Sequence, residues 1–161
     1  MKQYAAVLLM LGMLPWAELH AQGQTAQTTF RVQTTVQAVC TVTANDLDFG
    51  NYTQQSGTNS TTQLRAICSP QLTYNIGLNP GTSPGATVNQ RKMVSGANSL
   101  DYQLYSDSAR TTVWGETTGT NTVTGVGTGL AQDHTVFGAI PATQNLPAGT
   151  YADTITVSIF Y

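Results

Sequence analysis

The stretch that decides the fold is residues 151–161, which reads YADTITVSIFY. Apolar and polar residues alternate along it with the period of two that is typical of a half-buried β-strand. One face carries Ile155, Val157, Ile159 and Tyr161, and the other carries threonine and serine. Because the sequence ends on this strand, we expect the edge beside it to stay uncovered. An open apolar edge invites pairing with another chain.

The N-terminal part of the chain shows the opposite feature, an alternation that is too long for one strand. The apolar or β-branched positions are Phe30, Val32, Thr34, Val36, Ala38, Cys40 and Val42. An ordinary strand has about five or six residues, so a strand over residues 28–42 exceeds that length. Either it bends or switches sheets within one domain, or its N-terminal part pairs with a different molecule. The alternation alone leaves both explanations open.

Period-two runs recur along the rest of the chain and predict an all-β fold. The predicted strands are 28–42, 47–52, 62–68, 72–78, 100–105, 122–126, 134–140 and 152–161. Short strands at this spacing favour a sandwich of immunoglobulin-like topology, which normally closes its core with a seventh strand. The domain lacks a covering strand beside its C-terminal strand and has a surplus of strand-like sequence at its N-terminus. Together these two features predict that one molecule adds a strand to the next, head to tail. That arrangement generates a filament.

Residues 1–21 have the features of a secretory signal peptide. Lys2 is followed by an apolar run over residues 4–16, and Ala21 occupies the expected cleavage site. The apolar run is too short to span a bilayer. The remaining chain suits one domain, so we expect a single-domain exported protein.

Cys40 and Cys68 are the only cysteines of the chain. In an exported protein such a pair predicts a disulfide, since zinc needs three or four ligands and only one histidine, His134, follows the signal peptide. The formal net charge is -2 and only 9% of residues are charged. Without a basic stripe, nucleic acid is not an expected partner.

Motifs spread over most of the chain resemble the spore coat protein U domain family. They are CTV at 40–42, LDFGNY at 47–52, YNIGL at 74–78, RKM at 91–93, LDYQLYSD at 100–107, VWG at 113–115, TVFGAIP at 135–141 and PAGTYADT at 147–154, together with Cys68. Each motif is short, but their order and the cysteine spacing are specific in combination. The family includes subunits of archaic chaperone-usher pili of Gram-negative bacteria.

The resemblance implies an incomplete, pilin-type immunoglobulin-like sandwich that is completed by donor-strand complementation. A periplasmic chaperone would lend a strand to the open groove. At an outer-membrane usher, the N-terminal extension of a neighbouring pilus subunit would replace that strand. No cofactor or nucleotide is required.

Applied to this chain, the resemblance implies a donor-strand extension over residues 22–37 and a domain over 38–161. The donor residues would be Phe30, Val32, Thr34 and Val36. The acceptor groove and the chaperone contact would involve Ile155, Val157, Ile159 and Tyr161. The expected function is a structural subunit of a surface fibre that supports adhesion or biofilm formation. The alternative is a secreted coat or carbohydrate-binding protein whose long first strand covers its own edge.

The sequence predicts neither an enzyme nor a metal protein. His134 follows Asp133, but no G-x-S-x-G motif accompanies them. Asp46 and Asp48 lack the rest of a calcium loop, and no glycine lies in a phosphate-binding motif. Trp114 leaves a sugar site open as an interpretation, whereas Tyr102 shares a face with leucines and is expected in the core.

Overall fold

The computed structural model describes residues 23–161, so the predicted signal peptide lies outside the described residues. In that part of the chain all regular structure is β-strand, and no helix is long and apolar enough to cross a membrane. The strands are β1 (Cys40–Ala44), β2 (Thr58–Cys68), β3 (Thr73–Leu78), β4 (Arg91–Ser95), β5 (Asn98–Tyr105), β6 (Val123–Val126), β7 (Ala131–Ile140) and β8 (Val157–Phe160). The predicted all-β class is confirmed.

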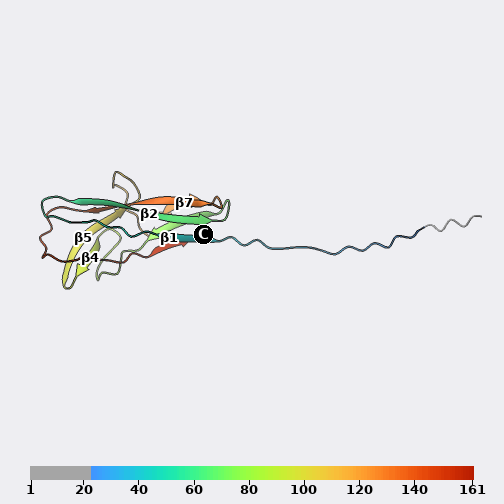
Figure 1. The fold of residues 1–161 in the computed structure, drawn as a ribbon, viewed down its shortest axis with the longest axis horizontal. Helices are drawn as coiled ribbons and strands as arrows, with labels where there is room; N and C mark the ends of the chain where they lie inside the picture. The colour runs from blue at the N-terminus through green and yellow to red at the C-terminus, as the bar shows by residue number, and fades with distance from the viewer. Residues whose placement is uncertain (1–22) are drawn as a thin grey trace, which may run out of the picture. The chain divides into compact units, whose positions relative to one another are not determined.

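The strands form two sheets of unequal size. The first has five strands in the order β1-β2-β7-β5-β4, and the second has three in the order β6-β3-β8. Neighbouring strands are antiparallel in both sheets. Figure 1 shows β2 and β7 running side by side in the larger sheet. The two sheets make an immunoglobulin-like β-sandwich, as the strand pattern predicts.

Inward-facing residues of both sheets form one core. Tyr74 and Ile76 of β3 are fully buried, and Leu64 of β2 faces them from the larger sheet. Tyr102 is buried in this core, as its shared face with leucines predicts. Trp114 is buried too, and its Nε1 donates a hydrogen bond of 2.8 Å to the Ile76 carbonyl. Its ring therefore offers no exposed face to a sugar.

The segment before β8 crosses from one sheet to the other. Ala152 pairs with Val94 at the outer edge of β4 through two backbone hydrogen bonds of 2.9 and 3.1 Å. Five residues later the chain enters β8 and pairs with β3. The predicted strand over 152–161 is therefore too long, because its first residues pair with β4 and only Val157–Phe160 form a ladder with β3.

The predicted strand over 28–42 is also wrong in its first part. Strand pairing begins at Cys40, where β1 aligns with the end of β2. Residues 23–35, considered by themselves, contain neither helix nor strand. The Phe30 and Val32 side chains are 86% and 82% exposed. Alternation indicates what a segment can do in a sheet, but a strand exists only where a partner supplies the hydrogen bonds.

Two further predictions fail for local reasons. Residues 47–52 are not a strand, because Gly50 adopts a φ of 65° and its N–H donates to the Asp48 carboxylate at 2.7 Å. Leu47 and Phe49 still pack against the core. Strand β4 was missed, since Arg91 and Lys92 interrupt its apolar alternation.

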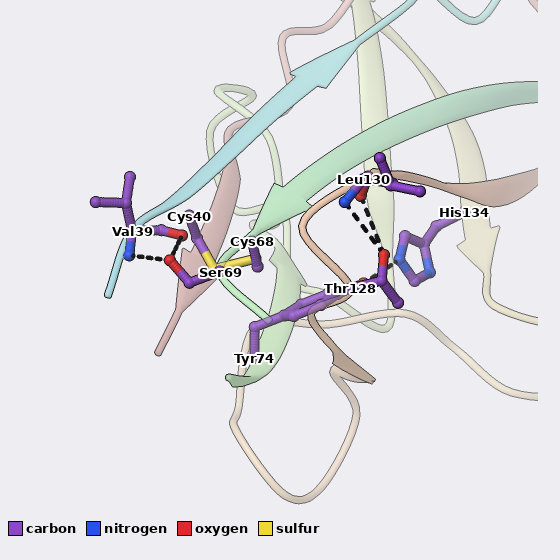
Figure 2. Close-up of a disulfide and its surroundings, with 8 residues drawn as sticks. All are labelled: Val39, Cys40, Cys68, Ser69, Tyr74, Thr128, Leu130 and His134. Carbon is purple, nitrogen blue, oxygen red and sulfur yellow. Dashed lines mark hydrogen bonds between the residues drawn. A yellow bond between two sulfur atoms is a disulfide. The ribbon is translucent and has the colours of Figure 1, made fainter. Parts of the chain in front are cut away.

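A disulfide joins Cys40 of β1 to Cys68 of β2, so the predicted bridge is confirmed. The two residues are direct cross-strand partners, with their Cα atoms 4.1 Å apart. Figure 2 shows the bridge beside Val39 and Ser69, where the Ser69 N–H donates to the Val39 carbonyl at 2.9 Å. The bridge fixes the first paired residue of the domain to the end of its neighbour.

Replacing both cysteines with alanine is expected to lower the free energy of unfolding by about 3–4 kcal/mol, because the bridge closes a long loop in the unfolded chain. The sequence separation of 28 between the two cysteines sets this magnitude. Urea denaturation of the oxidised wild type and the double variant measures the effect. A difference below about 1 kcal/mol would contradict this account of the bridge.

Candidate acceptor groove

The sandwich is open along one side, between β1 and β8. Strand β1 pairs with β2 and β8 pairs with β3, and neither has a second partner within residues 23–161. The two strands nevertheless approach each other across the gap between the sheets. The opposite side is different, because Ala152 joins the segment before β8 to β4. The opening is therefore flanked by two strand edges that can each accept a ladder.

A cavity of about 500 Å³ occupies this opening. Its floor is apolar and comes from both sheets. The larger sheet contributes Leu64, Tyr102, Leu104 and Val136, and the smaller one contributes Leu78 and Val157. Ile155 lines the cavity from the crossing segment, and Leu47 and Phe49 line it from the irregular segment after β1. This cavity, together with the two open strand edges, is called the acceptor groove below.

One end of the acceptor groove is polar, but its polar groups are already satisfied. The Tyr102 hydroxyl donates to Asp153 Oδ2 at 2.7 Å. Asp153 Oδ1 accepts hydrogen bonds from the Thr82 N–H at 2.9 Å and the Thr82 hydroxyl at 3.0 Å. Burial, and after it the bond with Asp153, raises the pKa of Tyr102. A tyrosine held protonated in this way is a structural hydrogen-bond donor rather than a base.

Arg91 is the only fully buried charged side chain among the described residues. Its guanidinium donates to the carbonyls of Leu78, Asn79, Val88 and Trp114 and to the Gln103 side chain, at 2.7–3.1 Å. Burial lowers its pKa, although the carboxylates of Asp153 and Glu116 favour the charged form. Arg91 thus joins the ends of β3 and β5 to the loop that carries Trp114. Those connections hold the two sheets together beside the acceptor groove.

Arg91→Ala is expected to destabilise the domain by about 3–5 kcal/mol, because five buried or partly buried acceptors lose their donor. Arg65→Ala is the matched control. Arg65 forms an ion pair with Asp133 at 2.7 Å, but both side chains are about half exposed. Its loss should leave the urea midpoint nearly unchanged, since exposed pairs contribute little. Equal midpoint shifts for the two variants would contradict the structural role of Arg91.

The predicted groove residues lie in different surroundings. Ile155 and Val157 line the cavity, and Ile159 packs against the core without lining it. Tyr161 is 61% exposed. The described structure holds no second chain, so the donor roles of Phe30, Val32, Thr34 and Val36 and the chaperone contact of Tyr161 stay predictions. Leu64, Leu104 and Val136 of the larger sheet were not among the predicted groove residues, although the alternation of β2, β5 and β7 places them on inward faces.

The remaining residues considered for catalysis or metal binding have structural roles. His134 Nε2 lies 2.9 Å from the Tyr74 hydroxyl, next to the disulfide, and burial lowers the pKa of the histidine (Figure 2). Asp48 caps the Gly50 turn. Within residues 23–161, no group of three or more His, Cys, Asp or Glu side chains is placed to hold a metal ion.

Comparison with known proteins agrees with this architecture. The model of the spore coat protein U domain matches residues 26–158. The chain belongs to the spore coat protein U domain family. It is 36% identical to protein U of Myxococcus xanthus over 101 residues, which are 62% of this chain and 56% of that protein.

A solved structure shares the fold at a TM-score of 0.59 and 28% sequence identity. It is the CsuC–CsuE chaperone–tip adhesion subunit pre-assembly complex of the archaic chaperone-usher Csu pili of Acinetobacter baumannii. The similarity covers 79% of this chain but only 40% of the solved chain. This spore coat protein U domain therefore spans less than two thirds of either relative.

Proposed function

We propose that this protein is a structural subunit of a chaperone-usher pilus whose acceptor groove takes up the N-terminal extension of a neighbouring subunit. The observation that supports this most directly is the apolar cavity of about 500 Å³ between the open edges of β1 and β8. An inserted strand gains main-chain hydrogen bonds from such edges and packs alternate side chains against the cavity floor.

The extension of this chain has the chemistry that the acceptor groove requires. Phe30, Val32 and Val36 recur at even spacing, and Val36 is 89% exposed. Each such side chain gains about 1.5–3 kcal/mol on full burial, and each new ladder bond adds about 1 kcal/mol net. Thr34 occupies the same face with a small side chain. The contact joins different surfaces of successive copies, so it extends into a fibre.

The partners proposed for this chain follow from the same site. Before polymerisation a periplasmic chaperone would occupy the acceptor groove, in line with the solved chaperone–subunit complex. Exchange would take place at an outer-membrane usher, and the fibre would lie on the surface of a Gram-negative bacterium. The exposed Tyr161 is the proposed chaperone contact beside β8. Adhesion or biofilm formation is the proposed role of the fibre, without catalysis or a cofactor.

Deleting residues 22–36 after the signal peptide should yield a subunit that binds its chaperone but cannot donate to a polymer. Co-purification with the chaperone and electron microscopy of surface fibres measure the two properties. The full-length chain under the same conditions is the control. If the truncated chain still forms fibres, the extension is not the donor. A full-length chain that stays a stable monomer would favour the self-completed coat protein.

The face of the donor strand can be tested with a pair of neighbouring substitutions. Val32→Asp places a charge on the face that enters the acceptor groove, whereas Gln33→Asp places it on the opposite face. We expect Val32→Asp to slow polymerisation at least tenfold and Gln33→Asp to change it less than threefold, since a buried unpaired charge is costly. Assembly rates from purified chaperone–subunit complexes measure both. Equal slowing would rule out the assigned face.

A further inference from the structure

A hollow of about 450 Å³ lies on the outer face of the larger sheet. The strand registers align Asn59 of β2, Ala139 of β7 and Gln103 of β5 in one row across three neighbouring strands. The buried residues of these strands occupy even-numbered positions, whereas these three occupy odd-numbered ones. They therefore lie on the face opposite the core. We call this hollow the lateral pocket.

Differences in side-chain length produce the lateral pocket. Ala139 has a single methyl group, and it lies between the longer side chains of Asn59 and Gln103 on the neighbouring strands. Tyr105 lies two residues along β5 from Gln103 on the same face, and Pro141 follows Ala139 at the same spacing. All five residues line the hollow. Ala139 is thus the floor, and the longer side chains around it are the walls.

The lateral pocket is lined by amide, carboxylate and phenol groups without any cation. Its polar side chains are Asn59, Asn89, Gln90, Asp101, Gln103 and Tyr105. None of the described residues that line it is a lysine, arginine or histidine. A phosphate or sulfate would find no positive charge there and would be repelled by Asp101. An apolar ligand would bury the amides without hydrogen-bond partners, which is costly. The lining therefore favours an uncharged ligand that carries many hydrogen-bonding groups.

Part of this lining is held in place by the domain itself. Gln103 Oε1 accepts hydrogen bonds from the Arg91 guanidinium at 2.7 Å and from the Leu104 N–H at 2.9 Å. The Asp101 N–H donates to Gln144 Oε1 at 2.8 Å, and Gln144 Nε2 donates to the Asp101 carbonyl at 2.9 Å. Groups that are fixed before a ligand arrives lose less conformational entropy on binding. These bonds are typical of a preformed site.

We propose that the lateral pocket binds a neutral sugar ring, such as a hexose unit of a surface polysaccharide. Each sugar hydroxyl can donate and accept a hydrogen bond, and each carboxamide offers a donor and an acceptor side by side. The carboxylate of Asp101 can accept from two hydroxyls. The apolar C–H face of the ring can pack on Tyr105, which combines an apolar body with a polar tip. The volume lies within the range of about 300–1,000 Å³ that is usual for small-ligand clefts.

The lateral pocket is separate from the acceptor groove. The groove opens between the edges of β1 and β8, whereas the pocket lies over the outer face of β2, β7 and β5. Sugar binding therefore does not depend on donor-strand exchange. A fibre would repeat the pocket once in every subunit, and weak sites that are linked in one particle bind together. A site with a Kd of about 1 mM is then enough to hold a fibre on a polysaccharide.

Ala139→Leu tests the site by filling its floor, with Ala131→Leu as the matched control. Both alanines lie on the outer face of β7, but only Ala139 lines the lateral pocket. The probes are the methyl pyranosides of glucose, galactose and mannose. Saturation-transfer NMR titrations of the purified full-length chain, in whichever assembly state it is recovered, measure the Kd of each probe. At least one probe should bind saturably, with a Kd raised about tenfold or more by Ala139→Leu and changed less than about twofold by Ala131→Leu.

A second pair of variants removes a polar contact without filling the hollow. Asn59→Ala should raise the same Kd about fivefold, because the sugar loses hydrogen bonds to one carboxamide. Gln63→Ala, on the same strand and face but outside the lateral pocket, should leave it unchanged. The urea midpoint of each variant reports whether the domain still folds. The uronate of the sugar that binds best should bind more weakly than the neutral sugar, because Asp101 repels its charge.

The outcomes separate this inference from the proposed function. The sugar site is overturned if none of the three pyranosides binds, if folded Ala139→Leu binds as well as the wild type, or if the uronate binds more tightly than its neutral sugar. None of these results affects donor-strand exchange, which the deletion of residues 22–36 tests. A stable monomer that binds a pyranoside through Ala139 and Asn59 overturns the fibre and leaves the sugar site standing.

Discussion

The structure depends on a mismatch between its two sheets. Five strands of the larger sheet face only three of the smaller one, and a cavity of about 500 Å³ lies against inward side chains of β2, β5 and β7. The crossing of residues 152–157 closes one side of the sandwich by pairing first with β4 and then with β3. No equivalent segment within residues 23–161 joins β1 to β8. Apolar surface left between two unpaired strand edges is unstable in water, and one inserted strand covers both the surface and the edges.

A domain with an open interior needs other constraints to keep its sheets in place. The disulfide joins β1 to β2 at one end of the opening, and Arg91 connects both sheets near the other. Asp153 fixes the crossing segment to Thr82 and Tyr102. Gly81 lies against the Asp153 carboxylate with a φ of 97°, so a side chain at this position would collide with it. These contacts are polar or covalent and lie around the acceptor groove, so its floor can remain apolar.

The sequence predicts the parts of this arrangement that follow from alternation. The inward face of residues 155–159 and the core position of Tyr102 follow from the period of two, and the pairing of the cysteines follows from their number in an exported chain. Alternation does not predict strand pairing correctly where residues distant in the sequence decide which strands pair. Residues 28–39 alternate as well as any strand but have no ladder, and Ala152 pairs with β4 instead of β3. The role of Arg91 could not be predicted for another reason. A single arginine in a sequence gives no sign that five acceptors converge on it.

Under the proposed function, the satisfied polar end of the acceptor groove would let one site serve two successive occupants. Asp153 accepts hydrogen bonds from both Tyr102 and Thr82, so these bonds do not depend on the side chains of an incoming strand. Recognition then comes from main-chain ladders and from the fit of apolar side chains against Leu64, Leu104 and Val136. Such recognition would tolerate different sequences with the same alternation, as the proposed succession of a chaperone strand and a subunit strand requires. Discrimination between them depends on how completely each fills the cavity, since unfilled apolar space is destabilising in proportion to its volume.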